Sequence, residues 1–286
     1  MVSTIDREAV LTEVGELADQ DDLAAYRKAR RRAHSRRLAT GAAGLLVLAI
    51  IWQVAAMLAN SVFLPSVTQT IQTFVHYIDR PYPSQGSPLW LDAVVSLRRI
   101  LVGFGIGVLA GVALGAAMSA STVVRHLIDP VIEVLRPLPP LAFIPLFIIW
   151  FGIGEMPKEI LIIIGVVPVM AVASVAAIDE VPQDMRLCAR TLGATRLHTL
   201  LRVQLRAALP GILTGMRICM AGAWTSIVAV ELIAATSGLG YLIMQAGDYL
   251  NTSLVFSGII FIAVLGLVLD LCIRGLLLLA DPSRRS

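Results

Sequence analysis

Long apolar runs, separated by shorter polar segments, dominate the chain after residue 38. A helix needs about 20 consecutive apolar residues to cross the roughly 30 Å hydrocarbon core of a bilayer. Six stretches meet or nearly meet that length: 39–59, 94–119, 131–152, 159–178, 212–235 and 254–279. The pattern predicts an all-α, polytopic membrane protein with about six transmembrane helices, because runs of this length satisfy their backbone hydrogen bonds internally only as helices.

The composition agrees with a membrane location. Of the 286 residues, 57% are hydrophobic and 15% are charged, and the mean hydropathy is +0.81. A soluble domain carries about 25% charged residues, so much of this surface faces something other than water. The three cysteines, Cys188, Cys219 and Cys272, have neither metal-ligand spacing nor the pattern of a disulfide framework. We therefore expect no metal site.

Basic residues gather in the segments expected on one side of the membrane. Residues 27–37 hold seven of the 23 lysines and arginines and directly precede the first apolar run. Such a run also occurs in nucleic-acid-binding tails, but its position favours a cytoplasmic anchor, and we expect no nucleic-acid partner. Residues 179–211 carry five arginines and fall on the same side, whereas 236–253 carry no Lys or Arg. Both termini are therefore predicted to be cytoplasmic.

The same pattern divides the chain into three parts. We predict a cytoplasmic N-terminal tail over 1–38, a transmembrane domain over 39–280 and a short cytoplasmic C-terminal tail over 281–286. The cytoplasmic loop 179–211 belongs to the transmembrane domain. No small-residue cleavage site follows the first apolar run, so we expect this run to be retained as a span.

Charged residues near the ends of spans need separate explanations. Arg98 and Arg99 lie near the predicted outer end of the second apolar stretch, against the charge asymmetry, and are expected to extend to the lipid headgroups. Asp270, in the last stretch, has Arg274 one helical turn away. This spacing favours an i,i+4 ion pair near the inner interface.

Prolines interrupt the third apolar stretch, at Pro137, Pro139, Pro140 and Pro145. Each proline removes a backbone donor from a helix, so neighbouring helices must shield the break from lipid. Such a break is compatible with a helix that lines a pathway and equally with a simple kink.

Four glycines recur every four residues in the second apolar stretch: Gly103, Gly107, Gly111 and Gly115. They form one smooth stripe along a helix, and small residues at this spacing let two helix backbones approach closely in lipid. The stripe predicts a packing face, either within the subunit or between two copies.

An acidic residue within the fifth apolar stretch is the best candidate for part of a transport path. Acidic side chains inside spans are costly and usually functional, and Glu231 has this position. Trp224, Thr225 and Ser226 precede it by one to two turns and are predicted to share one polar, aromatic face with it. Two interpretations stay open, a lining of the translocation path or its outer gate, and a structural pair near the hydrated outer end.

The segment 179–211 is long, basic and amphipathic, whereas a connection between spans needs only a few residues. A glycine interrupts its helical pattern. These properties suit docking against a soluble partner. The candidate docking residues are Leu187, Cys188, Ala189, Arg190, Thr191, Leu192, Gly193, Ala194, Val203 and Leu205.

This segment resembles the EAA loop of permeases from binding-protein-dependent ABC importers. The pattern of that loop is Glu-Ala-Ala, three residues, Gly, nine residues, then Ile-x-Leu-Pro. The glycine corresponds to Gly193, and the spacing is kept, whereas Leu187, Cys188 and Arg206 depart from the pattern. The resemblance implies that the loop forms a coupling helix seated in a groove of an ATPase subunit.

Over residues 40–280 the chain is similar to the taurine, sulfonate, nitrate and bicarbonate group of these permeases, and most similar to the taurine type. The matching stretches are 129–133, 136–142, 150–155, 230–236 and 238–241. The resemblance implies a type I ABC importer permease (MetI-like) fold in the bacterial inner membrane, surrounded by lipid. It also implies two ATP-binding subunits, an external solute-binding protein and a second permease copy, with a homodimer favoured.

The expected function is that of the permease subunit of an ATP-driven importer of a small anion. Taurine or another sulfonate is the first choice, and nitrate, bicarbonate or another small solute is the alternative. The chain has no GxxxxGK[ST] phosphate-binding loop and no catalytic constellation. We therefore expect no catalytic residue and no cofactor in this chain, with ATP and Mg²⁺ bound by the partner ATPase. Rivals from other classes are a self-sufficient secondary transporter or channel, and a membrane scaffold.

Overall fold

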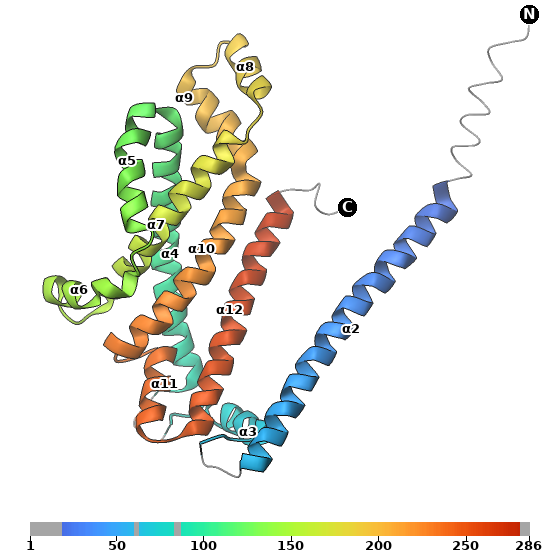
Figure 1. Ribbon diagram of the computed structural model, residues 1–286, viewed down its shortest axis with the longest axis vertical. Coiled ribbons are helices and arrows are strands. Elements are labelled where there is room, and N and C mark those ends of the chain that lie inside the picture. Colours follow the sequence, from blue (N-terminus) through green and yellow to red (C-terminus); the bar gives the residue numbers. More distant parts are fainter. Residues whose placement is uncertain (1–18, 60–62, 83–86, 281–286) are drawn as a thin grey trace, which may run out of the picture. The chain divides into compact units, whose positions relative to one another are not determined.

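The computed structural model describes residues 19–59, 63–82 and 87–280, and the regular elements in these residues are helices (Figure 1). The chain forms two compact units, residues 1–67 and 68–286. The predicted C-terminal tail and the first 18 residues of the N-terminal tail lie outside the described residues.

The first unit consists mainly of α2 (Asp19–Ala59), one continuous helix of 41 residues. Its apolar part, Ala39–Ala59, agrees with the first predicted span. The predicted boundary between tail and transmembrane domain at residue 38 is not a break in the helix. The reason is that the Arg- and Ala-rich residues before it also favour helix.

The second unit supplies the other spans. Its helices are α3 (Val67–Tyr77, whose first residue ends the first unit), α4 (Leu89–Ala120), α5 (Thr122–Leu135), α6 (Ile144–Phe151), α7 (Glu155–Asp179), α8 (Gln183–Thr191), α10 (Leu205–Ala234), α11 (Leu239–Asp248) and α12 (Thr252–Ala280). The described residues hold five helices long and apolar enough to cross a membrane, or six if one bent pair counts as a span. The prediction of about six transmembrane helices is confirmed.

The fifth span begins earlier than the sequence predicted, because Arg196–Ala234 is continuously helical. It comprises α9 (Arg196–His198), a π-helical turn η2 (Thr199–Gln204) and α10. Thr195 caps its start, since its hydroxyl accepts a hydrogen bond from the backbone N–H of His198 at 3.3 Å. The second half of the predicted loop 179–211 is therefore helical and continuous with the apolar part of α10, and its cytoplasmic position stays a prediction.

The third apolar stretch is bent rather than straight. α5 meets the 3₁₀ turn η1 (Pro140–Phe143) and α6 at an angle of 86°, and α6 leaves the line of α5 in Figure 1. Pro139 is extended, with φ −66° and ψ 126°, as a residue before a proline prefers. The prolines therefore end one helix and start another.

The glycine stripe of α4 lies against α7. A Cβ atom added at Gly103, Gly107, Gly111 or Gly115 would come within 2.6 to 2.9 Å of an atom of α7. At Gly111 that atom is the Cβ of Met170, at 2.6 Å. Side chains do not approach so closely, so only glycine lets the two backbones pack here. The stripe packs within the subunit.

α10 packs against both α7 and α12 and completes the apolar core of the second unit. Arg217 of α10 also pairs with Asp270 of α12, with Nη2 and Oδ2 at 2.8 Å. The predicted pairing of Asp270 with Arg274 is therefore wrong. The guanidinium of Arg217 offers two parallel hydrogen bonds across the helix interface, which is the stronger geometry.

Ion pairs and hydrogen bonds connect the ends of neighbouring helices in the second unit. At one end Arg125, in the first turn of α5, pairs with Asp179 at the end of α7, with Nη1 and Oδ2 at 3.0 Å. At the other end Arg99 of α4 contacts Glu155, the first residue of α7, and Ser237, between α10 and α11. Which end faces the cytoplasm stays a prediction.

Candidate functional site

A buried cluster of charges joins α4, α7 and α10 at the end of the unit away from α8 (Figure 1). Arg99 is fully buried, and its guanidinium donates to the carboxylates of Glu231 and Glu155, each at 2.7 Å. Lys158 donates to the same Glu155 at 2.9 Å. The two cations and the two carboxylates therefore pair with each other; Arg99 and Glu231 are fully buried, whereas the side chain of Glu155 is 40% exposed.

This cluster corrects the expectation for Arg99, which does not extend to the headgroups. Glu155 and Glu231 lie within its reach, and an unpaired buried charge would be far more costly. Its neighbour Arg98 behaves closer to expectation, because its side chain is 59% exposed and only its tip contacts Glu155, at 3.3 Å.

The same cluster caps the N-terminus of α11. The backbone N–H groups of residues 238–240 donate to the side chains of Asp92, Ser96 and Glu231, at 2.9, 2.9 and 3.0 Å. The first N–H groups of a helix have no partner within it, and the helix dipole favours carboxylates at this end. Glu231 thus has a structural role that explains its burial.

Two further residues complete the cluster. Gly238 has φ +109°, and a Cβ atom there would lie 2.5 Å from Oε1 of Glu231, so the position needs glycine. Tyr82 is buried beside Asp92. Burial, and then the charge of Asp92, raise the pKa of the Tyr82 hydroxyl.

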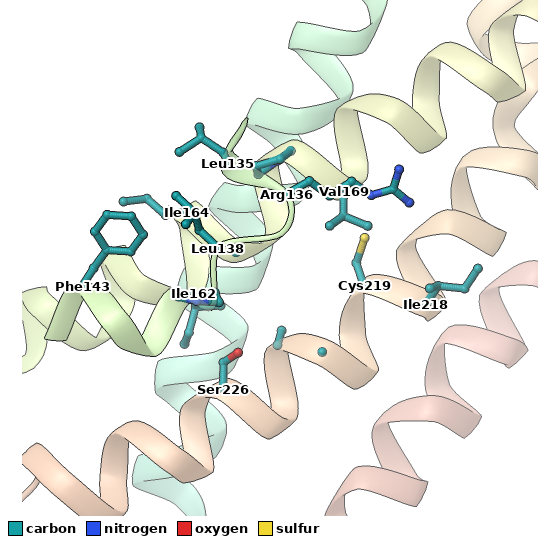
Figure 2. A pocket seen from close by; sticks show the side chains of 15 residues that line it. Leu135, Arg136, Leu138, Phe143, Ile162, Ile164, Val169, Ile218, Cys219 and Ser226 are labelled. Atoms are coloured by element: carbon teal, nitrogen blue, oxygen red, sulfur yellow. The ribbon is translucent and has the colours of Figure 1, made fainter. Parts of the chain in front are cut away.

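A cavity of about 220 Å³ lies between the bend after α5, α7 and α10 (Figure 2). Its wall is mostly apolar, with Phe143 and Ile162 among the lining side chains. The polar groups in the wall are the guanidinium of Arg136, the hydroxyl of Ser226 and the thiol of Cys219. The broken helix therefore forms one wall of a cavity, which favours the pathway interpretation over a simple kink.

The four residues of α10 predicted to share one face point in different directions. Trp224 faces α12, because its Nε1 would lie 2.9 Å from a Cβ atom added at Gly266. Thr225 is exposed and bonds to a carbonyl of its own helix at 3.0 Å. Ser226 lines the cavity, and Glu231 belongs to the charge cluster. The common face was wrong because consecutive helical residues are about 100° apart.

The C-terminus of α8 carries a glycine cap. The N–H of Gly193 donates to the carbonyl of Arg190, and the N–H of Ala194 to that of Ala189, each at 3.0 Å. These two bonds form a Schellman motif. Gly193 has φ +84°, a backbone conformation that glycine adopts more easily than other residues, and the helix ends at the glycine that interrupts the sequence pattern.

The helix α8 presents apolar side chains to solvent. Leu187 is 57% exposed and Leu192 is 88% exposed. The other candidate docking residues between them are exposed or half-buried, whereas Val203 and Leu205 are half-buried in the span. Arg186 fixes α8 to the end of α7, because its guanidinium donates to the carbonyl of Ile178 at 2.6 Å. Exposed apolar residues on such a fixed helix are compatible with the predicted docking role, which stays a prediction.

The fold and these sites define a multi-pass α-helical membrane protein with an exposed helix, α8, between two of its long helices. The family model described as "Binding-protein-dependent transport system inner membrane component" matches residues 103–286. The chain belongs to this family of inner-membrane permeases. Family membership thus replaces the rival interpretations as a secondary transporter or a scaffold.

Individual relatives agree with this assignment. The chain is 40% identical over 244 residues, 85% of its length and 88% of the relative, to the taurine transport system permease protein TauC of Escherichia coli K12. It is 34% identical to the putative aliphatic sulfonates transport permease protein SsuC of Bacillus subtilis, over 81% of this chain and 83% of that one.

A solved structure confirms the fold class. The permease of the MetNI methionine ABC transporter, in an inward-facing conformation, matches with a TM-score of 0.61. The match covers 68% of this chain and 96% of that chain at 18% identity, and it bears on the fold alone. The predicted type I ABC importer permease fold is therefore confirmed.

Two functional candidates were missed from the sequence. Arg99 was expected to reach the headgroups, although an arginine within an apolar stretch is also compatible with a buried acidic partner. Arg136 was not singled out, although it is a charged residue directly before Pro137 in an apolar stretch. That combination marks a side chain at a helix break, where cavities form.

Proposed function

We propose that this chain is the permease subunit of an ATP-driven importer of small sulfonates, with taurine as the first candidate cargo. The observation that carries the proposal is the 40% identity to a taurine transport permease over 85% of the chain. The similarity to a sulfonate transport permease supports the same chemical class. Nitrate and bicarbonate, which are also small oxyanions, are the alternative cargo.

The proposed complex holds two copies of this chain, two ATP-binding subunits and an external solute-binding protein. ATP and Mg²⁺ bind to the partner subunits, and α8 of each copy docks on them from the cytoplasm, where both termini also lie. The exposed Leu187 and Leu192 support this docking. Because Arg186 connects α8 with α7, movement of the ATPase reaches the spans and shifts the population between inward-facing and outward-facing states.

Transport in proteoliposomes tests the cargo. The complete complex is reconstituted with its solute-binding protein, and uptake of labelled taurine is measured with and without ATP. Other sulfonates, nitrate and bicarbonate are added as competitors. We expect ATP-dependent taurine uptake that sulfonates inhibit. Uptake of nitrate or bicarbonate with no response to any sulfonate would contradict the proposed cargo.

A pair of leucine substitutions tests the docking surface. Leu192→Asp places a charge on the 88% exposed leucine that directly follows α8 and should release the ATP-binding subunits during co-purification. Leu250→Asp is the matched control, because Leu250 is also exposed, at 67%, but follows α11 at the other end of the unit. Equal retention of the ATPase by the two variants would exclude α8 as the docking site.

A further inference from the structure

Arg136 has an unusual position for a charged residue in this fold. It follows the last residue of α5, lines the cavity, and is exposed in the single subunit. Within the described part of the chain, its guanidinium has no ion pair and no side-chain hydrogen bond. The other buried or membrane-embedded arginines described above, Arg99 and Arg217, each have a carboxylate partner.

The cavity lies deep within the spans. α5 has 14 residues, which corresponds to about 20 Å of helix between Arg136 and the end of the unit where Arg125 pairs with Asp179. The α7 residues of the wall, between Ile162 and Val169, begin seven residues from the first residue of α7, about 10 Å along the helix. An unpaired guanidinium at this depth is too costly to face lipid. The face that carries it must therefore face water or a polar ligand.

The chemistry of the cavity matches a small oxyanion with a short apolar part. A guanidinium binds oxyanions through two parallel hydrogen bonds, and the hydroxyl of Ser226 supplies a further donor. No carboxylate belongs to the described wall, while Phe143 and Ile162 supply apolar surface. The volume of about 220 Å³ is below the roughly 300–1,000 Å³ of drug-sized sites. Figure 2 shows Arg136 and Ser226 on separate parts of the wall.

We propose that Arg136 and Ser226 form a transient binding site for the oxyanion group of the transported solute, at the helix break within the membrane. The inference rests on the proposed function for the identity of the cargo, and it names the residues that the cargo meets on its path. One cation and one hydroxyl offset only part of the desolvation of an anion. The site therefore binds weakly enough to release its ligand, as conduction requires.

Thiol chemistry tests the site without knowledge of the cargo. The three cysteines are replaced, and Gly222→Cys places one thiol in the cavity wall, where a Cβ atom meets nothing within 4 Å. The membrane-embedded complex is treated with two methanethiosulfonate reagents of similar size, one carrying an ethylsulfonate and the other an ethyltrimethylammonium group. The measured quantity is the ratio of the two modification rates, anionic over cationic.

Arg136→Gln should lower that ratio by about tenfold, because it removes a unit charge from the wall, and Arg136→Lys should keep most of it. Arg274→Gln is the matched control, since Arg274 is an exposed arginine of a span that does not line the cavity, and it should leave the ratio unchanged. A ratio that does not respond to Arg136→Gln overturns the proposal. Such a result would indicate that Arg136 pairs with the second permease copy.

A second measurement covers the case in which Arg136→Gln does not assemble. With Arg136 intact, ethanesulfonate should slow the cationic reagent more than sodium chloride of equal ionic strength does, because it occupies the cavity. Equal effects of the two salts would overturn the proposal. A wrong proposed function can be distinguished from a wrong binding site, because only a wrong function abolishes sulfonate uptake by the unsubstituted complex. Uptake that is unaffected by Arg136→Gln contradicts only the site.

Discussion

The guanidinium of Arg99 and the carboxylate of Glu231 lie 2.7 Å apart, and neither side chain is exposed to solvent. They come from α4 and α10, and Glu231 also accepts the N–H of Gly240 at the start of α11. One ion pair thus fixes three helices at the same end of the unit. The pair favours this one arrangement of the helices, because either charge would be strongly destabilising if it were buried without its partner.

Removal of one partner from this pair should destabilise the protein severely. Glu231→Ala leaves the buried Arg99 without one of its carboxylates and should lower the free energy of unfolding by about 3–5 kcal/mol. Unfolding of the purified permease in detergent measures this change. Asp270→Ala is the control, because it breaks an ion pair of similar geometry that is partly exposed, and it should change stability much less.

A double variant shows whether the effect belongs to the pair. Arg99→Met combined with Glu231→Ala removes both charges and should recover part of the loss, since the uncompensated charge is then absent. Purely additive losses in the two single variants would show that Arg99 and Glu231 act separately.

A methyl group on the glycine stripe should force α4 and α7 apart. Gly111→Ala would place a Cβ atom 2.6 Å from the Cβ of Met170, and such overpacking costs about 1–3 kcal/mol. Gly105→Ala is the control on the same helix, because a Cβ atom there meets nothing within 4 Å. It should leave the unfolding midpoint unchanged or raise it, since alanine favours helix. Equal destabilisation by both changes would contradict the packing role.

We expect Gly193 to affect transport only through its backbone conformation, because no neighbouring atom restricts a side chain at this position. No atom lies within 4 Å of a Cβ atom added at Gly193, but its φ is +84°, which costs other residues about 1–2 kcal/mol. Gly193→Val should therefore weaken the cap and reduce the ATPase activity stimulated by the loaded binding protein. Gly193→Asn should retain more activity, because asparagine tolerates this conformation. The reverse order of the two variants would argue against a conformational cause.

Substitution of Trp224 should affect stability, whereas substitution of Ser226 should affect uptake. Trp224→Ala removes an indole packed beside Gly266 of α12 and should destabilise the protein by about 2 kcal/mol, because the side chain is only half buried. Ser226→Ala should leave stability unchanged and lower uptake, since Ser226 lines the cavity. Parallel measurement of unfolding and uptake separates the two effects, and normal uptake in Ser226→Ala would remove this residue from the path.

The spans and the glycine cap were predictable from the sequence because their causes are local. Apolar length decides whether a helix can cross the bilayer, and Gly193 follows the end of a helical pattern. The charge cluster was not predictable in this way. Glu231 comes 132 positions after Arg99 in the chain, and hydropathy does not distinguish a buried pair from a side chain that reaches the headgroups.

The direction of side chains within α10 was also beyond the sequence pattern. Consecutive residues of a helix point in different directions, as Trp224, Thr225 and Ser226 do. Which neighbour each side chain meets depends on how α7 and α12 pack against α10. The start of the helix that contains the fifth span was missed for a related reason. The polar residues after Thr195 read as a loop, although they lie on a helix that protrudes beyond its apolar part.

The contacts between α4 and α7 have a mechanical consequence. The two helices are tied by Arg99 and Glu155 at one end, by the glycine stripe along their length, and by the link from Arg125 of the adjoining α5 to Asp179 at the other end. Contacts of this kind oppose sliding of one helix along the other, so we expect α4 and α7 to move as one rigid body. In the proposed mechanism, a displacement of α8 passes through Arg186 to α7. The tilt of this rigid body then produces the larger movement at its far end, where α11 is held.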